Sequence, residues 1–155
     1  MNMKIRKLKI KKIISFLLIF LMIFVVGCHK DKNVEINKII DIVEFDELIN
    51  EKGVLKYDIR STAVCEEGHI PSFMCMGSNN VDNKKLDEII KNIKLLYSDK
   101  DKKIVIIDED NVNSLYILNA LKEDGYKQLF YFDGGYNSYK EKKGPSFVPE
   151  VGCNC

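Results

Sequence analysis

The apolar run at positions 104–107 constrains the fold more than any other feature of the sequence. These positions read Ile-Val-Ile-Ile and lie between Lys103 and the acidic Asp108. A short run that is apolar at every position is typical of a strand buried on both faces, in the middle of a parallel sheet. Neighbouring parallel strands need crossover connections, so the rest of the chain must supply the helices that make them.

Strand and helix patterns do alternate along the chain. Apolar residues recur at helical spacing over 84–98, and a second helix carries Leu115, Leu118 and Leu121 before ending at Asp124-Gly125. The remaining expected elements are strands at 54–59, 73–76 and 129–132, short helices at 46–49, 61–67 and 136–142, and a strand or helix end at 39–43. We therefore predict an α/β fold with a small central parallel sheet flanked by helices on both faces.

The amino-terminal region has the layout of an export signal. Residues 1–27 contain six basic residues and no acidic one, and positions 13–26 are apolar except for Ser15. Fourteen residues are fewer than the roughly 20 that span a bilayer as a helix, but they suit the apolar part of a signal peptide. The junction Val25-Val26-Gly27-Cys28 resembles the lipobox of bacterial lipoproteins, in which the cysteine is acylated and becomes the first residue. The alternative is an uncleaved anchor flanked by Lys12 and Lys30.

These features predict the organisation of the chain. We expect a signal peptide at 1–27 cleaved before Cys28, a polar spacer at 28–38, a folded domain at 39–148 and a cysteine-containing tail at 149–155. The expected location is the extracytoplasmic face of the cell membrane, with the lipid on Cys28 holding the protein there. Residues 28–155 contain 18 basic and 23 acidic residues, a net charge of −5, which argues against a nucleic-acid partner.

Three segments, in order, resemble the rhodanese domain and together cover residues 39–148. The first holds Asp58-Ile59-Arg60 and then Glu67-Gly68-His69-Ile70-Pro71, and the second is the strand at 103–107 with the loop up to Ser114. The third holds Gly125-Tyr126, Gly134-Gly135 and Gly144-Pro145. The resemblance implies a fold built for sulfane-sulfur transfer, with Asp58, Arg60 and His69 in the walls of the site and His69 in a structural role.

The sequence departs from that family at the loop that carries the family's catalytic residue. Alignment of the central strand places Asp108 at the position of the catalytic cysteine, and the loop that follows is Glu109, Asp110, Asn111, Val112 and Asn113. An aspartate cannot carry a persulfide, and three successive carboxylates repel an anionic sulfur donor. Asp108 is instead able to accept hydrogen bonds from the inward N–H groups of the loop, as a capping carboxylate does. We therefore expect no conventional sulfurtransferase activity, no catalytic residue at this loop and no cofactor.

Four cysteines remain after Cys28: Cys65, Cys75, Cys153 and Cys155. An even number outside the cytoplasm is typical of disulfides, and redox exchange and metal binding are the other possibilities. Two histidines make a weak zinc set, so we expect no metal. Cys65 and Cys75 both lie near the predicted mouth of the fold, and we predict that they pair.

Three functions are open at this point. The first is a lipid-anchored binding or sensing module, with a protein partner that the sequence does not identify. The second is a thiol–disulfide or persulfide enzyme that uses Cys65/Cys75 or Cys153/Cys155. The third is a plain surface lipoprotein recognised through the exterior of its fold.

Overall fold

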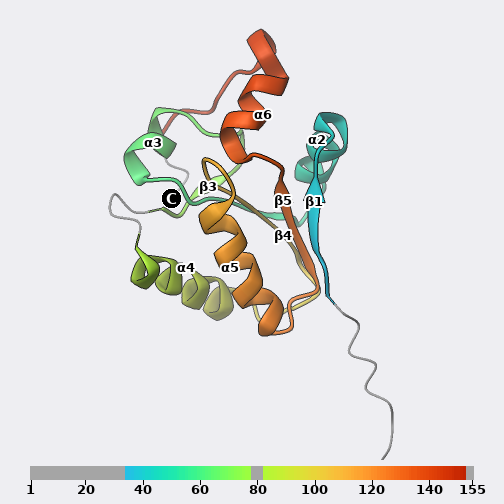
Figure 1. Cartoon of the computed structure of the whole chain (residues 1–155), viewed down its shortest axis with the longest axis vertical. Helices are drawn as coiled ribbons and strands as arrows, with labels where there is room; N and C mark the ends of the chain where they lie inside the picture. Colours follow the sequence, from blue (N-terminus) through green and yellow to red (C-terminus); the bar gives the residue numbers. More distant parts are fainter. Residues whose placement is uncertain (1–33, 78–81, 153–155) are drawn as a thin grey trace, which may run out of the picture. The chain divides into compact units, whose positions relative to one another are not determined.

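The computed structural model describes residues 34–77 and 82–152 of the 155-residue chain, all within the compact unit Asn33–Cys155 (Figure 1). The expected signal peptide, Cys28, Cys153 and Cys155 lie outside the described residues. Within the described part, no helix combines the length and apolar character needed to cross a membrane.

Five strands form one parallel sheet in the order β1-β5-β4-β2-β3. In chain order the elements are β1 (Ile36–Ile39), α2 (Ile42–Asn50), β2 (Leu55–Asp58), α3 (Thr62–Glu67), β3 (Met74–Cys75), α4 (Asn83–Leu96), β4 (Lys103–Ile107), α5 (Val112–Glu123), β5 (Gln128–Phe132), α6 (Gly135–Lys143) and the 3₁₀ turn η1 (Gly144–Ser146). The predicted α/β fold with a central parallel sheet is confirmed.

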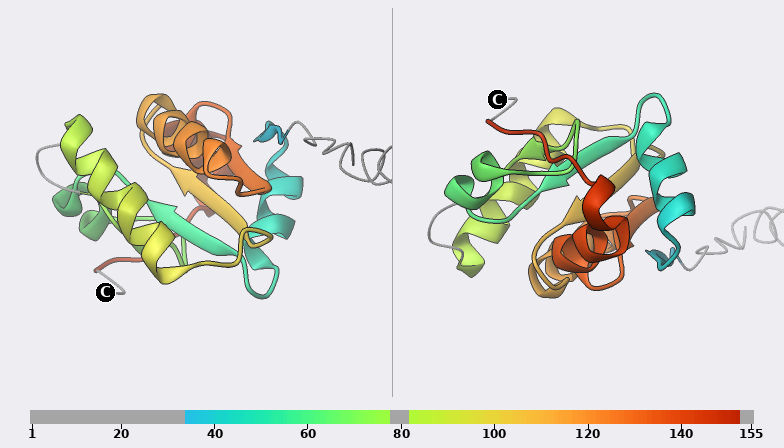
Figure 2. Two further views of the ribbon diagram at one scale, coloured as in Figure 1. Left: turned by 90° about the horizontal axis from the view of Figure 1, so that it is seen from below. Right: turned by 90° about the horizontal axis from the view of Figure 1, so that it is seen from above.

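Strand β4 lies in the middle of the sheet, and its residues alternate between two cores. Ile104 and Ile106 pack with the apolar residues of α4 and α5, while Val105 and Ile107 pack with those of α2 and α6. The helices therefore cover both faces of the sheet (Figure 2). All four of these β4 residues are fully buried, which is why the run contains no polar position.

Polar residues in the loops determine where the helices begin. The side chain of Asp41 accepts hydrogen bonds from the N–H groups of Val43 and Glu44, at 2.8 and 2.9 Å, and starts α2. Asp82 caps α4 in the same way by accepting from Lys85 N at 2.9 Å. A side-chain oxygen at this position satisfies N–H groups that the first turn of a helix leaves without a partner.

The structure corrects two expected boundaries. Strand β1 begins at Ile36, inside the stretch 28–38 that we expected to be a spacer, and pairs with β5 from Leu129 onward. It is a four-residue edge strand whose middle residues are exposed, so it carries no strong apolar pattern. The stretch 39–43 is divided between the end of β1 and the start of α2, which begins four residues earlier than the helix expected at 46.

Aromatic side chains fill the space between β5, α2 and α6. The Tyr139 ring packs edge-on against Phe45 and Phe132, with ring centroids 5.5 and 5.7 Å away. Its hydroxyl donates a hydrogen bond to Asp46 Oδ1 at 2.9 Å. Burial, followed by the hydrogen bond to the Asp46 carboxylate, raises the pKa of Tyr139 above its ordinary value.

The substitution Tyr139→Phe tests this arrangement. We expect a loss of about 1 kcal/mol in the free energy of unfolding at neutral pH, because Asp46 loses a hydrogen-bond donor. The unfolded tyrosine ionises near pH 10 while the folded one stays neutral, so the stability of the native protein falls as the pH rises above about 10. This alkaline loss should be smaller in Tyr139→Phe, as measured by urea unfolding at several pH values. The matched control is Tyr131→Phe on the half-exposed face of β5. Equal alkaline losses in both variants would contradict the assignment.

Candidate functional site

The polar residues predicted for the site gather at the carboxyl edge of the sheet. In the strand registers, Asp58 of β2 lies beside Ile107 of β4 on one side and beside Cys75 of β3 on the other. Asp108 follows Ile107 directly, so the ends of three adjacent strands bring Asp58, Cys75 and Asp108 to the same edge. Open parallel sheets form their binding sites at this edge.

The carboxylate of Asp108 fills the start of the loop between β4 and α5. The side chain is fully buried. Its Oδ1 accepts hydrogen bonds from Asn111 N at 2.9 Å and from Ser114 Oγ at 2.7 Å. Its Oδ2 accepts from Asn113 N at 2.8 Å and from Ser114 N at 3.3 Å. Asp108 therefore caps the inward N–H groups of the loop, as the sequence predicted.

The other residues of the loop, from Glu109 to Asn111, lie between the Asp108 cap and the start of α5. Asn111 takes a left-handed backbone conformation with φ of 78° immediately before α5, and its buried Oδ1 has no hydrogen-bond partner within the described part of the chain. Asp110 is exposed and accepts a hydrogen bond from Val112 N at 3.1 Å. Glu109 is exposed as well. The outer rim of the loop is therefore acidic, and the N–H groups that point into the loop already donate hydrogen bonds to the Asp108 carboxylate.

The glycine pair at 134–135 allows α6 to start against this loop. Both residues have positive φ, 79° and 65°, and a Cβ atom on Gly135 would lie 2.5 Å from the Asp108 carbonyl oxygen. The next residue, Tyr136, donates its N–H to that oxygen at 2.8 Å. Only glycine permits both the conformation and the close approach. The predicted tight turn at Gly134-Gly135 is therefore confirmed.

Asp58 and Arg60 form a buried ion pair in the wall of the site. Arg60 Nη2 lies 2.6 Å from Asp58 Oδ2, and the Arg60 Nε lies 3.0 Å from both carboxylate oxygens. Nη2 also donates to the Gly68 carbonyl at 2.8 Å, and the guanidinium lies 3.5 Å from the centroid of the Tyr136 ring. Burial raises the pKa of Tyr136, and the charge of Arg60 opposes that rise. Arg60 thus contacts three segments at the site: the end of β2 at Asp58, the turn at Gly68 and the start of α6 at Tyr136.

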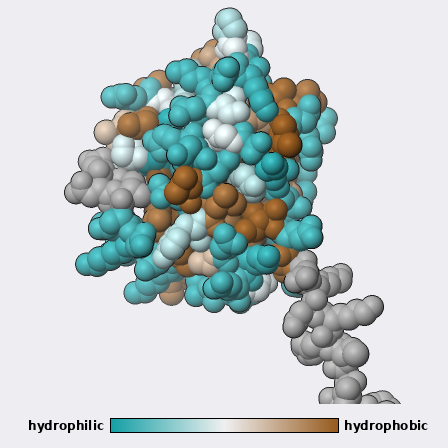
Figure 3. Space-filling view, viewed as in Figure 1, coloured by the Kyte–Doolittle hydropathy of each residue, from teal (hydrophilic) through white to brown (hydrophobic). Residues whose placement is uncertain are grey.

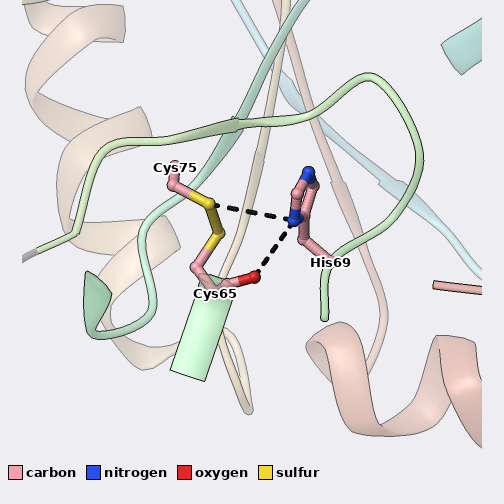
Figure 4. A group of neighbouring side chains, drawn as sticks. All are labelled: Cys65, His69 and Cys75. Atoms are coloured by element: carbon pink, nitrogen blue, oxygen red, sulfur yellow. Dashed lines mark hydrogen bonds between the residues drawn. A yellow bond between two sulfur atoms is a disulfide. The ribbon is translucent and has the colours of Figure 1, made fainter. Parts of the chain in front are cut away.

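His69 contacts a disulfide, as Figure 4 shows. Cys65 and Cys75 are bonded with Cα atoms 5.9 Å apart, which confirms the predicted pair. His69 Nδ1 lies 3.0 Å from the Cys65 carbonyl oxygen and 3.9 Å from Cys75 Sγ. A carbonyl only accepts, so we assign the proton to Nδ1. The buried Nε2 lies 3.8 Å from Glu150 Oε2 and has no hydrogen-bond partner among the described residues.

The disulfide cysteines and His69 form the one group in the described part of the chain that has the ligand types and spacing of a metal site. The ligand atoms of Cys65, His69 and Cys75 all lie within 4.8 Å of one another. Zinc and copper bind the thiolate form of cysteine, whereas both sulfurs are here bonded to each other. This cluster can hold a metal only after the disulfide is reduced.

The sequence did not indicate that the tail belongs to this cluster. Pro149 packs against Gly68, where a Cβ atom would come within 3.1 Å of the proline ring. Glu150 and His69 exchange two backbone hydrogen bonds of 2.9 Å. The expected boundary at 148 therefore divides a segment that packs as part of the domain. An isolated bridge of one residue pair leaves no periodic pattern that could have indicated it.

Comparison with solved structures agrees with the fold. The chain is similar to a rhodanese-like domain protein from Staphylococcus aureus, with 19% identity, a TM-score of 0.55, and coverage of 75% of this chain and 98% of that one. It is similar to the Alr3790 protein from Anabaena sp., with 17% identity, a TM-score of 0.54, and coverage of 71% and 88%. A thiosulfate sulfurtransferase from Pseudomonas aeruginosa matches with 15% identity and a TM-score of 0.58, over 78% of this chain but only 20% of the other.

Sequence comparison identifies the family. None of the curated proteins compared with the chain matches it significantly. The sequence profile described as Rhodanese, the rhodanese-like domain, matches residues 41–142, which is more than half of the chain. These residues run from the N-cap of α2 into α6 and contain β2 to β5 and the Asp108 loop. The chain belongs to the rhodanese-like domain family.

Proposed function

We propose that this protein is a binding or sensing module with a rhodanese-like fold, held at the extracytoplasmic face of the cell membrane and without conventional thiosulfate sulfurtransferase activity. The observation that carries the proposal is the buried Asp108 carboxylate, which accepts four hydrogen bonds from the loop that follows β4. In the family, the corresponding loop presents its N–H groups to an anionic sulfur donor and carries a cysteine persulfide. Here an internal anion takes those hydrogen bonds.

The surroundings of the loop favour the same conclusion. A donor such as thiosulfate is an anion and would have to approach past the exposed carboxylates Glu109 and Asp110. The buried guanidinium of Arg60 is directed at Asp58 and the Gly68 carbonyl. It therefore provides no free positive charge for a donor at the mouth of the loop.

A protein partner is more compatible with the exterior near this loop. Hydrophilic side chains cover most of the face in Figure 3 and surround small hydrophobic areas. The exposed apolar residues of the described chain include Val112 and Tyr116, both on α5. Apolar side chains beside the acidic rim of the loop suit a polypeptide with basic and apolar groups.

The first test is the transfer of sulfur from thiosulfate to cyanide, followed by the colorimetric thiocyanate assay. We expect no turnover by the purified protein, because both the low-pKa thiol and the anion-binding loop are missing. Asp108→Cys alone should restore little or nothing, since Glu109 and Asp110 remain. The triple variant Asp108→Cys/Glu109→Arg/Asp110→Ser should be the more active of the two. Rapid turnover by the unmodified protein, lost when its cysteines are alkylated, would show that another sulfur does the chemistry.

A second prediction concerns stability. Asp108→Ala leaves three backbone N–H groups and one hydroxyl of the loop without their acceptor, so we expect a loss of about 2–4 kcal/mol in the free energy of unfolding. Asp110→Ala is the matched control, because this exposed carboxylate caps only Val112 N and its loss should cost about 1 kcal/mol or less. Urea unfolding followed by circular dichroism measures both. Equal losses in the free energy of unfolding would show that the buried Asp108 cap stabilises the domain no more than the exposed Asp110 does.

The third prediction concerns the anchor, which rests on the basic start, the apolar run and the Val-Val-Gly-Cys junction of the sequence. Mass spectrometry of the native protein should find an acylated Cys28 at the mature amino-terminus. Cys28→Ser should abolish the lipid and release the protein from the tight membrane association that two acyl chains give. A membrane-bound protein with an intact Met1 terminus would favour the uncleaved anchor instead.

A further inference from the structure

One ring nitrogen of the buried His69 has no hydrogen-bond partner among the described residues. This nitrogen, Nε2, lies 3.8 Å from Glu150 Oε2, which is beyond hydrogen-bond distance. The other nitrogen, Nδ1, lies 3.0 Å from the Cys65 carbonyl and donates to it. In the uncharged ring a proton on Nδ1 leaves Nε2 as an acceptor, so two acceptors face each other. Buried polar atoms normally have partners, and this exception needs an explanation.

The Glu150 carboxylate is held opposite that nitrogen. Its Oε2 accepts a hydrogen bond from Ser72 N at 2.6 Å, and the backbones of Glu150 and His69 exchange two hydrogen bonds of 2.9 Å. A carboxylate beside one nitrogen of a histidine is the usual arrangement where the other nitrogen binds a metal ion. The metal-free nitrogen then carries the proton and donates it to the carboxylate. A metal ion on Nδ1 would therefore give Nε2 the partner that it lacks.

Nδ1 faces the two cysteine sulfurs, as Figure 4 shows. It lies 3.9 Å from Cys75 Sγ, and the ligand atoms of Cys65, His69 and Cys75 all lie within 4.8 Å of one another. Tetrahedral zinc, at about 2.3 Å from a sulfur and about 2.0 Å from a nitrogen, holds those two atoms about 3.5 Å apart. The nitrogen and the nearer sulfur are therefore already close to the separation that a shared zinc ion requires.

The backbone holds both cysteines in place by contacts other than the disulfide. Cys65 lies within α3, and Cys75 of β3 lies in register with Asp58 of β2. Their Cα atoms are 5.9 Å apart. Tetrahedral zinc needs the two sulfurs about 3.8 Å apart, which rotation about the Cα–Cβ bonds provides once the sulfurs are no longer bonded to each other. The two sulfurs can therefore reach zinc-binding positions without a rearrangement of the sheet.

The ligand set and its surroundings fit zinc. The described residues supply two thiolates and one imidazole, and a Cys₂His set that leaves the fourth position to water or to a substrate is one of the known zinc arrangements. Two thiolates also balance the charge of Zn²⁺, which suits a site whose Cys65 and His69 are fully buried. Cys75 is half-buried on the short edge strand β3, and this side of the cluster gives an ion access.

We propose that Cys65, Cys75 and His69 Nδ1 form a zinc site that exists only in the reduced protein. An external dithiol reduces the Cys65–Cys75 bond: the dithiol becomes a disulfide, and the two cysteines take up its two electrons and two protons. Zinc then binds both sulfurs as thiolates, and two protons pass to solvent. The proton on Nδ1 moves through solvent to Nε2, which donates it to Glu150. The Cys65 carbonyl keeps the Gly68 N–H, at 3.1 Å, as its donor.

The disulfide and the zinc ion are therefore alternative states of one cluster. The domain converts the redox state of an external thiol pair into the binding or release of a metal ion. This inference goes beyond the proposed binding or sensing role and is independent of the Asp108 loop, because it uses different residues. It would stand even if the protein turned over thiosulfate.

The first experiment measures zinc binding by a full chain that retains only the two cysteines of the cluster. Cys28→Ser/Cys153→Ser/Cys155→Ser leaves Cys65 and Cys75 of the five cysteines. After reduction and anaerobic removal of the reductant, calorimetric titration should give one zinc ion per chain with a Kd of about 1 µM or lower. The same protein with its disulfide intact is the matched control and should bind at least about 100-fold more weakly, because its sulfurs are not thiolates. No saturable binding after reduction, or equal binding by both forms, would overturn the proposal.

The second experiment identifies the nitrogen that binds zinc. In the same protein, ¹⁵N NMR of the His69 ring should find the proton on Nδ1 while the disulfide is intact. One equivalent of zinc added to the reduced protein should move the proton to Nε2 and give Nδ1 the shift of a metal-bound nitrogen. Zinc on Nε2, or a ring whose signals do not change, would contradict the proposed geometry.

Three substitutions in the same background test the individual contacts. His69→Ala removes a ligand and should weaken zinc binding at least about 100-fold. Glu150→Gln keeps an acceptor oxygen but removes the charge that faces Nε2, and should weaken binding about tenfold. Glu67→Gln is its matched control, because this carboxylate is exposed on α3, and should leave the Kd unchanged. Equal Kd values in the two glutamine variants would contradict the role of Glu150 as a positioning residue. Circular dichroism checks each fold, and the ring NMR decides the ligand if His69→Ala unfolds.

Discussion

The buried carboxylate of Asp108 is the contact on which the carboxyl edge of the sheet depends. Its two oxygens take the N–H groups of Asn111, Asn113 and Ser114, and its own carbonyl takes the N–H of Tyr136. One residue therefore joins the end of the central strand β4 to the starts of both α5 and α6. The close approach of Gly135 and the left-handed Asn111 are geometric consequences of this junction. The Asp108 carboxylate accepts the hydrogen bonds that the N–H groups of the loop donate. The loop therefore has a structural role here, as the corner that joins β4 to α5 and α6.

Arg60 connects that corner to the disulfide cluster. Its guanidinium pairs with Asp58, stacks on Tyr136 beside the Asp108 loop, and donates to the carbonyl of Gly68, the residue before His69. The edge of the sheet thus has two halves with different chemistry. One half is a closed polar corner, and the other contains the disulfide, the histidine and the attached tail.

The sequence predicted the parts of the fold that bury a strong apolar pattern. Strand β4 and helix α4 were recognised because their burial imposes a continuous run in one and helical spacing in the other. The Asp108 cap and the Cys65–Cys75 pair were also predicted, because strand ends and chain separation limit where such residues can lie. Strand β1 and the attachment of Glu150 to His69 were missed. Both depend on backbone hydrogen bonds to distant segments, and any residue other than proline can form these without leaving a pattern in the sequence.

The measurement that tests the central claim most directly is a titration of the backbone amides with thiosulfate, followed by ¹H–¹⁵N NMR. If the Asp108 carboxylate occupies the loop, the amides of Asn111, Asn113 and Ser114 keep their positions over the titration, apart from the general drift caused by ionic strength. Sodium sulfate at matched ionic strength provides the reference for that drift. A saturable movement of these three amides, specific to thiosulfate, would show that the loop still binds the anionic donor and would contradict the account.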